Sequence, residues 1–135
     1  MFADAGYWIG IRNRDDVHHE DALGIARRIV REKIRLVVTP FIFAEVYAIL
    51  SRNEIVRELF IRDVWENSTV LIEQTVLEDQ RDAISLLKQW RDKTFSFTDA
   101  LSFVVMNRLG IKRAISFDKH FQDYGQFEII SSPRW

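Results

Sequence analysis

Short apolar segments of three or four residues alternate with longer segments of helical periodicity along this 135-residue chain. The short segments, which we interpret as buried strands, are residues 1–3, 36–38, 70–72, 113–116 and 127–130. Between them, apolar residues recur at the spacing typical of amphipathic helices. Strands joined by helical crossovers run parallel and have helices on both faces. The pattern therefore predicts an α/β fold with a mainly parallel sheet.

The longer segments carry recognisable helix signals. The predicted helices are residues 5–11, 18–33, 40–52, 53–64, 75–90 and 96 or 98 to 109, with a turn or short helix at 118–121. Thr39-Pro40 places a capping hydroxyl before a proline in the first turn, and Thr75 with Glu78 forms a predicted capping box. No repeat, low-complexity run or Pro/Gly-rich linker divides the chain, so we expect one domain over residues 1–135.

The composition excludes several classes of protein. The chain has no cysteine, which rules out disulfide scaffolds, thiolate nucleophiles and Cys-ligated zinc or iron–sulfur sites. Its longest apolar run is five residues (Val46–Leu50), far short of the roughly 20 that span a bilayer. With no sign of a signal peptide at the N-terminus, a cytoplasmic location is expected.

The net charge of −1 lacks the strong positive field of many nucleic-acid-binding domains. Binding to nucleic acid would therefore depend on local basic residues. Arg12 and Arg14 follow the first predicted strand–helix unit, where they are candidates to hold phosphates. Ordinary solvation of a loop is the alternative interpretation of both.

Four of the twenty acidic residues stand apart by their positions. Asp4 follows the first predicted strand and Asp118 the fourth, and ligands in parallel sheets bind beyond the carboxyl ends of strands. Glu45 has apolar neighbours one helical turn away on both sides. We therefore expect it to project from the apolar face, where a carboxylate is costly without a partner or a cation. Asp99 opens a predicted helix in the segment Ser96-Phe97-Thr98-Asp99.

Each acid also has a purely structural interpretation. Asp4, Asp99 and Asp118 are placed to cap a helix or turn, while Glu45 could bend to solvent or pair with an arginine. Together, however, they lie near one edge of the predicted sheet, where crowded carboxylates repel unless a divalent cation neutralises them. Oxygen-only ligands favour Mg²⁺ or Mn²⁺ over zinc. Such a site suggests metal-assisted phosphodiester hydrolysis.

Motif residues in one characteristic order run through essentially the whole chain: Asp4…Glu45…Thr98-Asp99-Ala100…Ser116-x-Asp118-x-x-Phe121. The surrounding residues add to the pattern: Phe2-Ala3-Asp4, Asp16-x-His18-x-x-Asp21-Ala22 and Thr39-Pro40…Glu45-Val46. The set resembles the PIN domain, and in particular the small VapC-type ribonucleases.

The resemblance implies a three-layer α/β/α fold with a twisted parallel sheet of four or five strands, and hydrolysis of single-stranded RNA by a metal-activated water. One or two Mg²⁺ or Mn²⁺ ions would be held by Asp4, Glu45, Asp99 and Asp118. Thr98 and Ser116 would supply hydroxyls that orient these acids. Ala5 replaces the Ser or Thr found in many family members, which puts one further hydrogen bond to the site in doubt.

The resemblance also suggests partners. A toxin of this type would need inhibition, typically by an antitoxin segment that fills the groove over the acids. The aromatic residues exceed what one small core needs, and we expect the surplus at a homodimer face or a groove for a partner helix: Phe41, Phe43, Tyr47, Phe60, Trp65 and Phe103. The alternative function is a PIN-like domain that binds RNA or protein without cleaving it.

Overall fold

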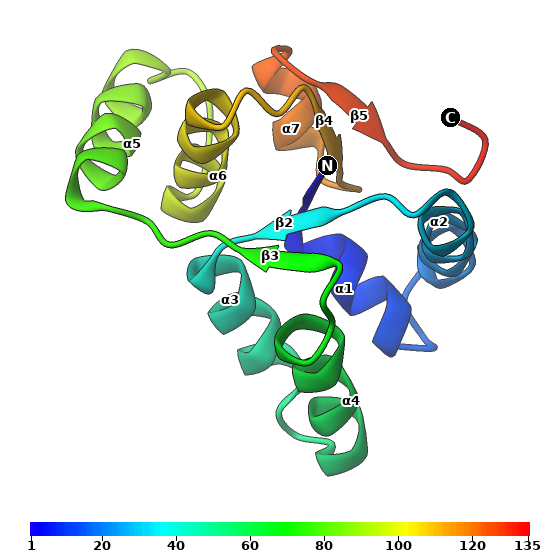
Figure 1. Cartoon of the computed structure of the whole chain (residues 1–135). Coiled ribbons are helices and arrows are strands. Elements are labelled where there is room, and N and C mark those ends of the chain that lie inside the picture. Colours follow the sequence, from blue (N-terminus) through cyan, green and yellow to red (C-terminus); the bar gives the residue numbers. More distant parts are fainter.

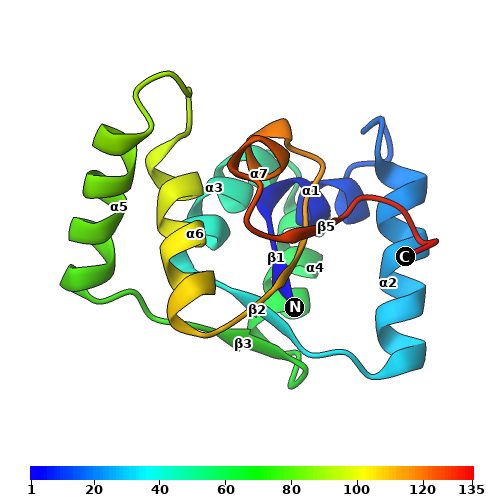
Figure 2. The same cartoon turned by 90° about the horizontal axis from the view of Figure 1, so that it is seen from above.

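The computed structural model describes residues 1–135 as a five-stranded, all-parallel sheet with seven helices (Figures 1 and 2). The strand order is β3-β2-β1-β4-β5, with bounds β1 (Phe2–Ala3), β2 (Leu36–Val38), β3 (Val70–Ile72), β4 (Arg113–Ile115) and β5 (Glu128–Ile130). The helices are α1 (Ala5–Arg12), α2 (His19–Glu32), α3 (Pro40–Leu50), α4 (Glu54–Trp65), α5 (Leu77–Gln89), α6 (Phe97–Arg108) and α7 (Lys119–Tyr124). None of these helices combines the length and apolar character needed to cross a membrane. The predicted parallel α/β fold is confirmed.

Helices lie against both faces of the sheet. In Figure 1, α1, α3 and α4 gather on one side, whereas α6 and α7 lie on the other with α5 outside α6. Aromatic packing follows the same division. Trp8 of α1 and Phe43 of α3 both contact Phe60 of α4. On the opposite face, Phe2 of β1 stacks against Phe121 of α7, whose ring is 4.9 Å from that of a phenylalanine in α6.

The shortest strand is at the centre of the sheet. Phe2 of β1 pairs with Val37 of β2 on one side and with Ala114 of β4 on the other. The pairing continues for one more residue, because the Asp4 amide donates to the Ile115 carbonyl at 3.0 Å. Since β1 and β4 are parallel neighbours, the residues that follow them meet at the carboxyl edge of the sheet.

Helix α5 begins differently from the sequence prediction. The predicted capping box at Thr75 and Glu78 is wrong: the helix starts at Leu77, and the Asp79 carboxylate accepts from the Val76 amide at 3.0 Å. Asp79 is 2% exposed and accepts two hydrogen bonds from Arg108 of α6, at 2.8 and 3.0 Å. This tertiary ion pair fixes which acid caps the helix.

Candidate active site

Asp4 connects β1 to α1 in the interior of the protein. Its carboxylate is buried, and its Oδ2 accepts a hydrogen bond of 2.7 Å from the Ser116 hydroxyl. Burial raises the pKa of Asp4 to about 7; the Ser116 hydrogen bond opposes that rise, and the charges of Asp99 and Asp118 add to it. The Ser116 hydrogen bond therefore fixes the position of the Asp4 carboxylate but does not compensate for the cost of burying its negative charge.

The segment after β4 supplies Ser116 and Asp118. The Ser116 hydroxyl oxygen accepts from the Asp118 amide at 3.1 Å while its hydrogen is donated to Asp4. Asp118 caps α7, since its Oδ1 accepts from the His120 amide at 2.9 Å. Its side chain is nevertheless open to solvent, with 43% exposed. One hydroxyl therefore links the two acids that end β1 and β4.

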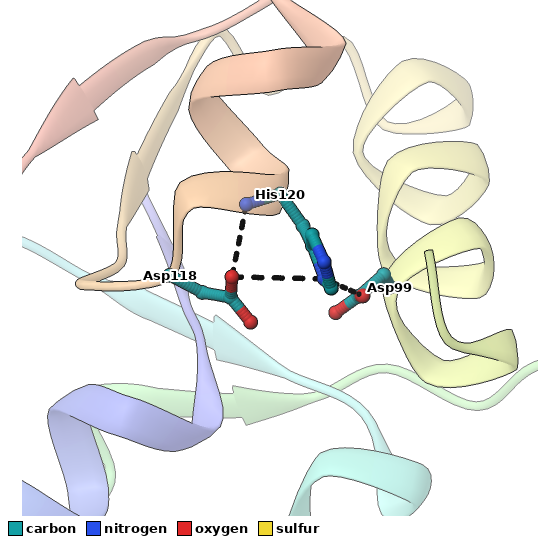
Figure 3. Close-up of side chains that lie close together, drawn as sticks. All are labelled: Asp99, Asp118 and His120. Carbon is teal, nitrogen blue, oxygen red and sulfur yellow. Dashed lines mark hydrogen bonds and ion pairs between the residues drawn. The ribbon is translucent and has the colours of Figure 1, made fainter. Parts of the chain in front are cut away.

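Asp99 caps the start of α6 and also belongs to the group of acids, so both interpretations of this residue hold. Its Oδ2 accepts from the Ser96 amide at 2.9 Å, and its own amide donates to the Ser96 hydroxyl at 3.0 Å, which completes a capping box at the start of α6. The side chain is also oriented toward His120 and Asp118 (Figure 3). Capping fixes the position of this carboxylate without removing it from the site.

The expected position of Glu45 on the apolar face is wrong. The buried stripe of α3 is formed by Ile42, Val46 and Leu50, and the Glu45 side chain is exposed. Because α3 carries apolar residues on every side, including the half-exposed Ile49, apolar neighbours alone do not identify its buried stripe. Partial burial and the charges of Asp99 and Asp118 raise the pKa of Glu45. Glu45 is thus exposed to solvent and still near enough to Asp99 and Asp118 to experience their charges.

The four acids are close enough to influence one another electrostatically. Asp4 and Glu45 each experience the negative charges of both Asp99 and Asp118. No arginine or lysine forms an ion pair with any of the four, although nine other acid–base pairs in the protein involve arginine. Excess negative charge made up of oxygen ligands, without a cationic side chain, is the donor set that suits a hard divalent cation.

His120 also belongs to this group, although no motif in the sequence pointed to it. Its Nδ1 is 2.8 Å from Asp99 Oδ2 and 3.6 Å from Asp118 Oδ1 (Figure 3). The available signal was its position two residues after Asp118, in a predicted turn that directs both side chains to one edge of the sheet. A single histidine in a polar turn was too common a feature to stand out.

The remaining candidates are placed less directly. The Thr98 hydroxyl makes no hydrogen bond with any of the four acids, and only its backbone carbonyl is bonded, by Ser102. Arg12 lies at the far end of α1 from Asp4 and forms a two-pronged ion pair with Asp63 of α4. Arg14 is exposed and has no ion pair. Both arginines line a surface cavity of about 580 Å³ beside the carboxyl end of α1.

An aromatic pair lies next to the acids. His18 stacks on Phe117 with their ring centres 4.3 Å apart and their planes 3° from parallel. Phe117 stands between Ser116 and Asp118, and it also covers Gly6, where an added Cβ would lie 3.6 Å from the ring. The pair holds the loop after β4 against the start of α2.

Comparisons with known proteins find similar sequences and a similar structure. Residues 1–126 match the family model of the PIN domain. A VapC ribonuclease of Archaeoglobus fulgidus is 34% identical over 120 residues, which cover 87% of this chain and 76% of that protein. The 23S rRNA-specific endonuclease VapC20 of Mycobacterium tuberculosis is 29% identical over 131 residues, covering 96% of this chain and 97% of that protein.

A solved structure shows the same fold. The crystal structure of Mycobacterium tuberculosis VapC20, described as a sarcin–ricin loop cleaving toxin, superposes with a TM-score of 0.81 and 24% sequence identity. The superposition covers 94% of this chain and 96% of the other. The likeness is therefore one of the fold over nearly the whole of both chains.

Proposed function

Because this chain belongs to the PIN domain family and is a ribonuclease of the VapC type, we propose that it is a divalent-metal-dependent endoribonuclease acting on single-stranded RNA. The proposed metal-binding residues are Asp4, Glu45, Asp99 and Asp118. The observation that carries the proposal is that Asp4 and Glu45 each experience the negative charges of Asp99 and Asp118, and that no arginine or lysine forms an ion pair with any of the four. The donor set favours Mg²⁺ or Mn²⁺.

The roles of the protein groups follow from their contacts. The Ser116 hydroxyl orients the buried Asp4 carboxylate, and the capping box at Ser96 orients that of Asp99. Glu45 and Asp118, the more exposed pair, are accessible to a substrate phosphate and to water. When bound, a divalent cation would lower the pKa of water and stabilise the charge that develops on the phosphate. Asp4 and Asp99, whose carboxylates are held by these hydrogen bonds, would position the reacting groups.

The test is cleavage of a single-stranded RNA by the purified protein with Mn²⁺, with Mg²⁺ and with a chelator. We expect cleavage with the metals, none with the chelator, and a loss of at least about 100-fold in Asp118→Asn and Asp99→Asn. Asparagine keeps a side-chain oxygen that can accept the backbone hydrogen bonds made by Asp118 and Asp99, so we expect both variants to keep their folds. Asp82→Asn on α5 is the control with the same change of charge at an exposed position.

Two results would overturn the proposal. Undiminished cleavage in both site variants would show that these acids are not the metal ligands. A protein that binds RNA and cleaves none with either metal would instead support the non-catalytic alternative. Unfolding experiments with and without metal distinguish these results from misfolding of a variant. A folded protein that binds the ion is stabilised by it, because the ion binds only the native state.

We also propose that the chain is the toxin of a toxin–antitoxin pair in the cytoplasm. One relative is described as a toxin, and the cavity beside α1 combines Arg14, which has no ion pair, with apolar Ile55 and Leu59. These features suit an amphipathic, acidic segment of an antitoxin protein. The test is a search for a short adjacent reading frame, followed by inhibition of RNA cleavage by its product.

A homodimer completes the proposal. Of the surplus aromatic residues, Phe60 and Phe103 are fully buried, whereas Tyr47 is 36% and Trp65 is 55% exposed. Exposed aromatic side chains favour contact with a second copy. Light scattering of the purified protein gives the mass directly, and a monomer at micromolar concentration would contradict this part.

A further inference from the structure

His120 lies between two of the four acids, with its imidazole oriented into the site (Figure 3). Its Nδ1 is 2.8 Å from Asp99 Oδ2 and 3.6 Å from Asp118 Oδ1. One potential ligand atom from each of the three residues lies within 4.8 Å of the other two. The imidazole side chain is only 20% exposed. A nitrogen donor is therefore present in a group that otherwise consists of carboxylate oxygens.

The orientation of this ring is fixed from its other side. Nε2 is 3.3 Å from the Thr94 hydroxyl, in the segment between α5 and α6. The ring also meets Phe95 nearly edge-on, at 5.7 Å between centres and 74° between planes. With Nε2 bonded to Thr94, Nδ1 is the nitrogen that faces the acids. Histidine ligands in metalloproteins are usually held in this manner, with the second ring nitrogen bonded to a polar group.

The distances also fit coordination. Adjacent ligands of an octahedral ion at 2.0–2.1 Å are about 3 Å apart. The separations of Nδ1 from the two carboxylate oxygens, 2.8 and 3.6 Å, lie on either side of that value.

We propose that His120 Nδ1 is a ligand of the metal ion, together with Asp99 and Asp118. This inference rests on the proposed function, since it concerns the same site. Its consequence is selectivity: imidazole favours late first-row ions such as Ni²⁺ and Co²⁺, whereas Mg²⁺ favours oxygen ligands. We therefore expect this site to bind Ni²⁺ more tightly than a site of the same charge with carboxylate ligands alone. The structural alternative is that His120 only holds Asp99 by a hydrogen bond.

A spectroscopic test detects the nitrogen directly. Pulsed electron paramagnetic resonance of the Mn²⁺-loaded full chain, with any affinity tag removed, reports nitrogen nuclei bonded to the ion. We expect a ¹⁴N coupling in the wild type and in His18→Gln, and its loss in His120→Gln. His18 is the matched control because its ring stacks on Phe117 beside the site and contacts none of the acids. Bound Mn²⁺ without ¹⁴N coupling in the wild type would overturn the inference.

Calorimetric titration tests the selectivity. In His120→Gln we expect Ni²⁺ affinity to fall at least about tenfold, while Mg²⁺ affinity changes much less. His120→Asp adds a carboxylate in place of the nitrogen donor, so we expect the ratio of Ni²⁺ affinity to Mg²⁺ affinity to fall relative to the wild type. Equal losses for the two ions in His120→Gln would identify a hydrogen-bonding role instead and overturn ligation.

The outcomes separate this inference from the proposed function. A wild-type protein that binds neither Mn²⁺, Ni²⁺ nor Mg²⁺ removes the metal site, and both proposals fail. A wild-type protein that binds Mn²⁺ through oxygen atoms alone keeps the proposed function and removes only His120 from the ligand set.

Discussion

The Ser116 hydroxyl donates a 2.7 Å hydrogen bond to Asp4 Oδ2, and the two residues are separated by 112 positions in the sequence. The contact joins the ends of the neighbouring strands β1 and β4. The same hydroxyl oxygen accepts from the Asp118 amide. One serine therefore sets the relative positions of two acids that belong to opposite ends of the chain.

Removing this hydroxyl is expected to weaken metal binding. In Ser116→Ala, the hydrogen bond that opposes the rise in the pKa of Asp4 is lost, and the Asp118 amide loses its acceptor. We expect Mn²⁺ affinity at neutral pH to fall about 10- to 100-fold in calorimetric titrations. Ser102→Ala is the control, since it removes another buried serine hydroxyl that bonds only a backbone carbonyl in α6. Equal affinities of the two variants would contradict the role of Ser116.

The buried Asp4 carboxylate makes stability depend on pH. Its pKa rises from 3.8 to about 7 on folding, so the folded state binds this proton more tightly than the unfolded state. The stabilisation is complete below the unfolded value and is lost as pH rises from about 4 to about 7. The asparagine of Asp4→Asn stays neutral at every pH. Without metal, the free energy of unfolding of this variant therefore rises relative to that of the wild type over this range, by on the order of 4 kcal/mol at about pH 7.

Urea unfolding in the presence of a chelator, repeated from pH 4 to pH 8, checks this difference. Added Mn²⁺ reverses the order, because only the wild type retains the ligand. A difference in the free energy of unfolding that stays constant across the pH range would contradict the burial argument. Asp82→Asn, which changes an exposed acid, gives the baseline.

Glu45 is expected to affect activity without affecting the fold. Its side chain is exposed and forms no hydrogen bond or ion pair with another residue. Glu45→Gln therefore lowers RNA cleavage by about 100-fold or more and changes the free energy of unfolding by less than about 0.5 kcal/mol. Initial cleavage rates and urea unfolding check the two parts. Glu58→Gln on α4 is the matched control, which keeps its cleavage rate.

Arg108 is expected to stabilise the pair of helices α5 and α6. Arg108→Met leaves the buried Asp79 carboxylate without its cationic partner. We expect the free energy of unfolding to fall by about 2–4 kcal/mol. Arg81→Met, at an exposed position 3.9 Å from Glu78, changes it by less than about 1 kcal/mol. Equal effects in chemical unfolding would contradict the difference in burial.

The two candidate arginines are expected to differ. Arg12 is bound to Asp63, so Arg12→Ala lowers stability by roughly 1–3 kcal/mol and leaves the salt dependence of RNA binding unchanged. Arg14 is free, and Arg14→Ala lowers the slope of log affinity against log salt by about 0.7. Fluorescence anisotropy with RNA, in an Asp118→Asn background that prevents cleavage, measures both slopes. Identical slopes for the two variants would contradict this assignment.

The sheet could be predicted because its signals are local. Each strand is a short apolar run next to a helix with its own cap, such as Thr39, whose hydroxyl accepts from the Ile42 amide at 3.3 Å. The parallel arrangement then follows from the crossovers. The positions of Asp4 and Asp118 could also be predicted, because residues that directly follow parallel strands lie at the carboxyl edge of the sheet.

What the sequence could not supply depends on contacts between distant residues. The partner of Arg12 is Asp63, 51 positions away, and the acid that caps α5 is selected by Arg108, 29 positions from it. The exposed position of Glu45 was missed because α3 is apolar on every side. His120 gains meaning only when α6 brings Asp99 beside it.

Asp99 forms a capping box, whereas the Glu45 side chain makes no hydrogen bond or ion pair. Substitutions at the two positions are therefore expected to have different effects on the folded protein. A replacement at Asp99 that cannot accept from the Ser96 amide removes the chemistry and loosens the start of α6, so the altered chain is degraded more readily. By contrast, a replacement at Glu45 is expected to lower RNA cleavage while leaving the cellular abundance of the protein unchanged. Among survivors selected for resistance to this protein, full-length, well-expressed chains are therefore expected to carry changes at Glu45 more often than at Asp99.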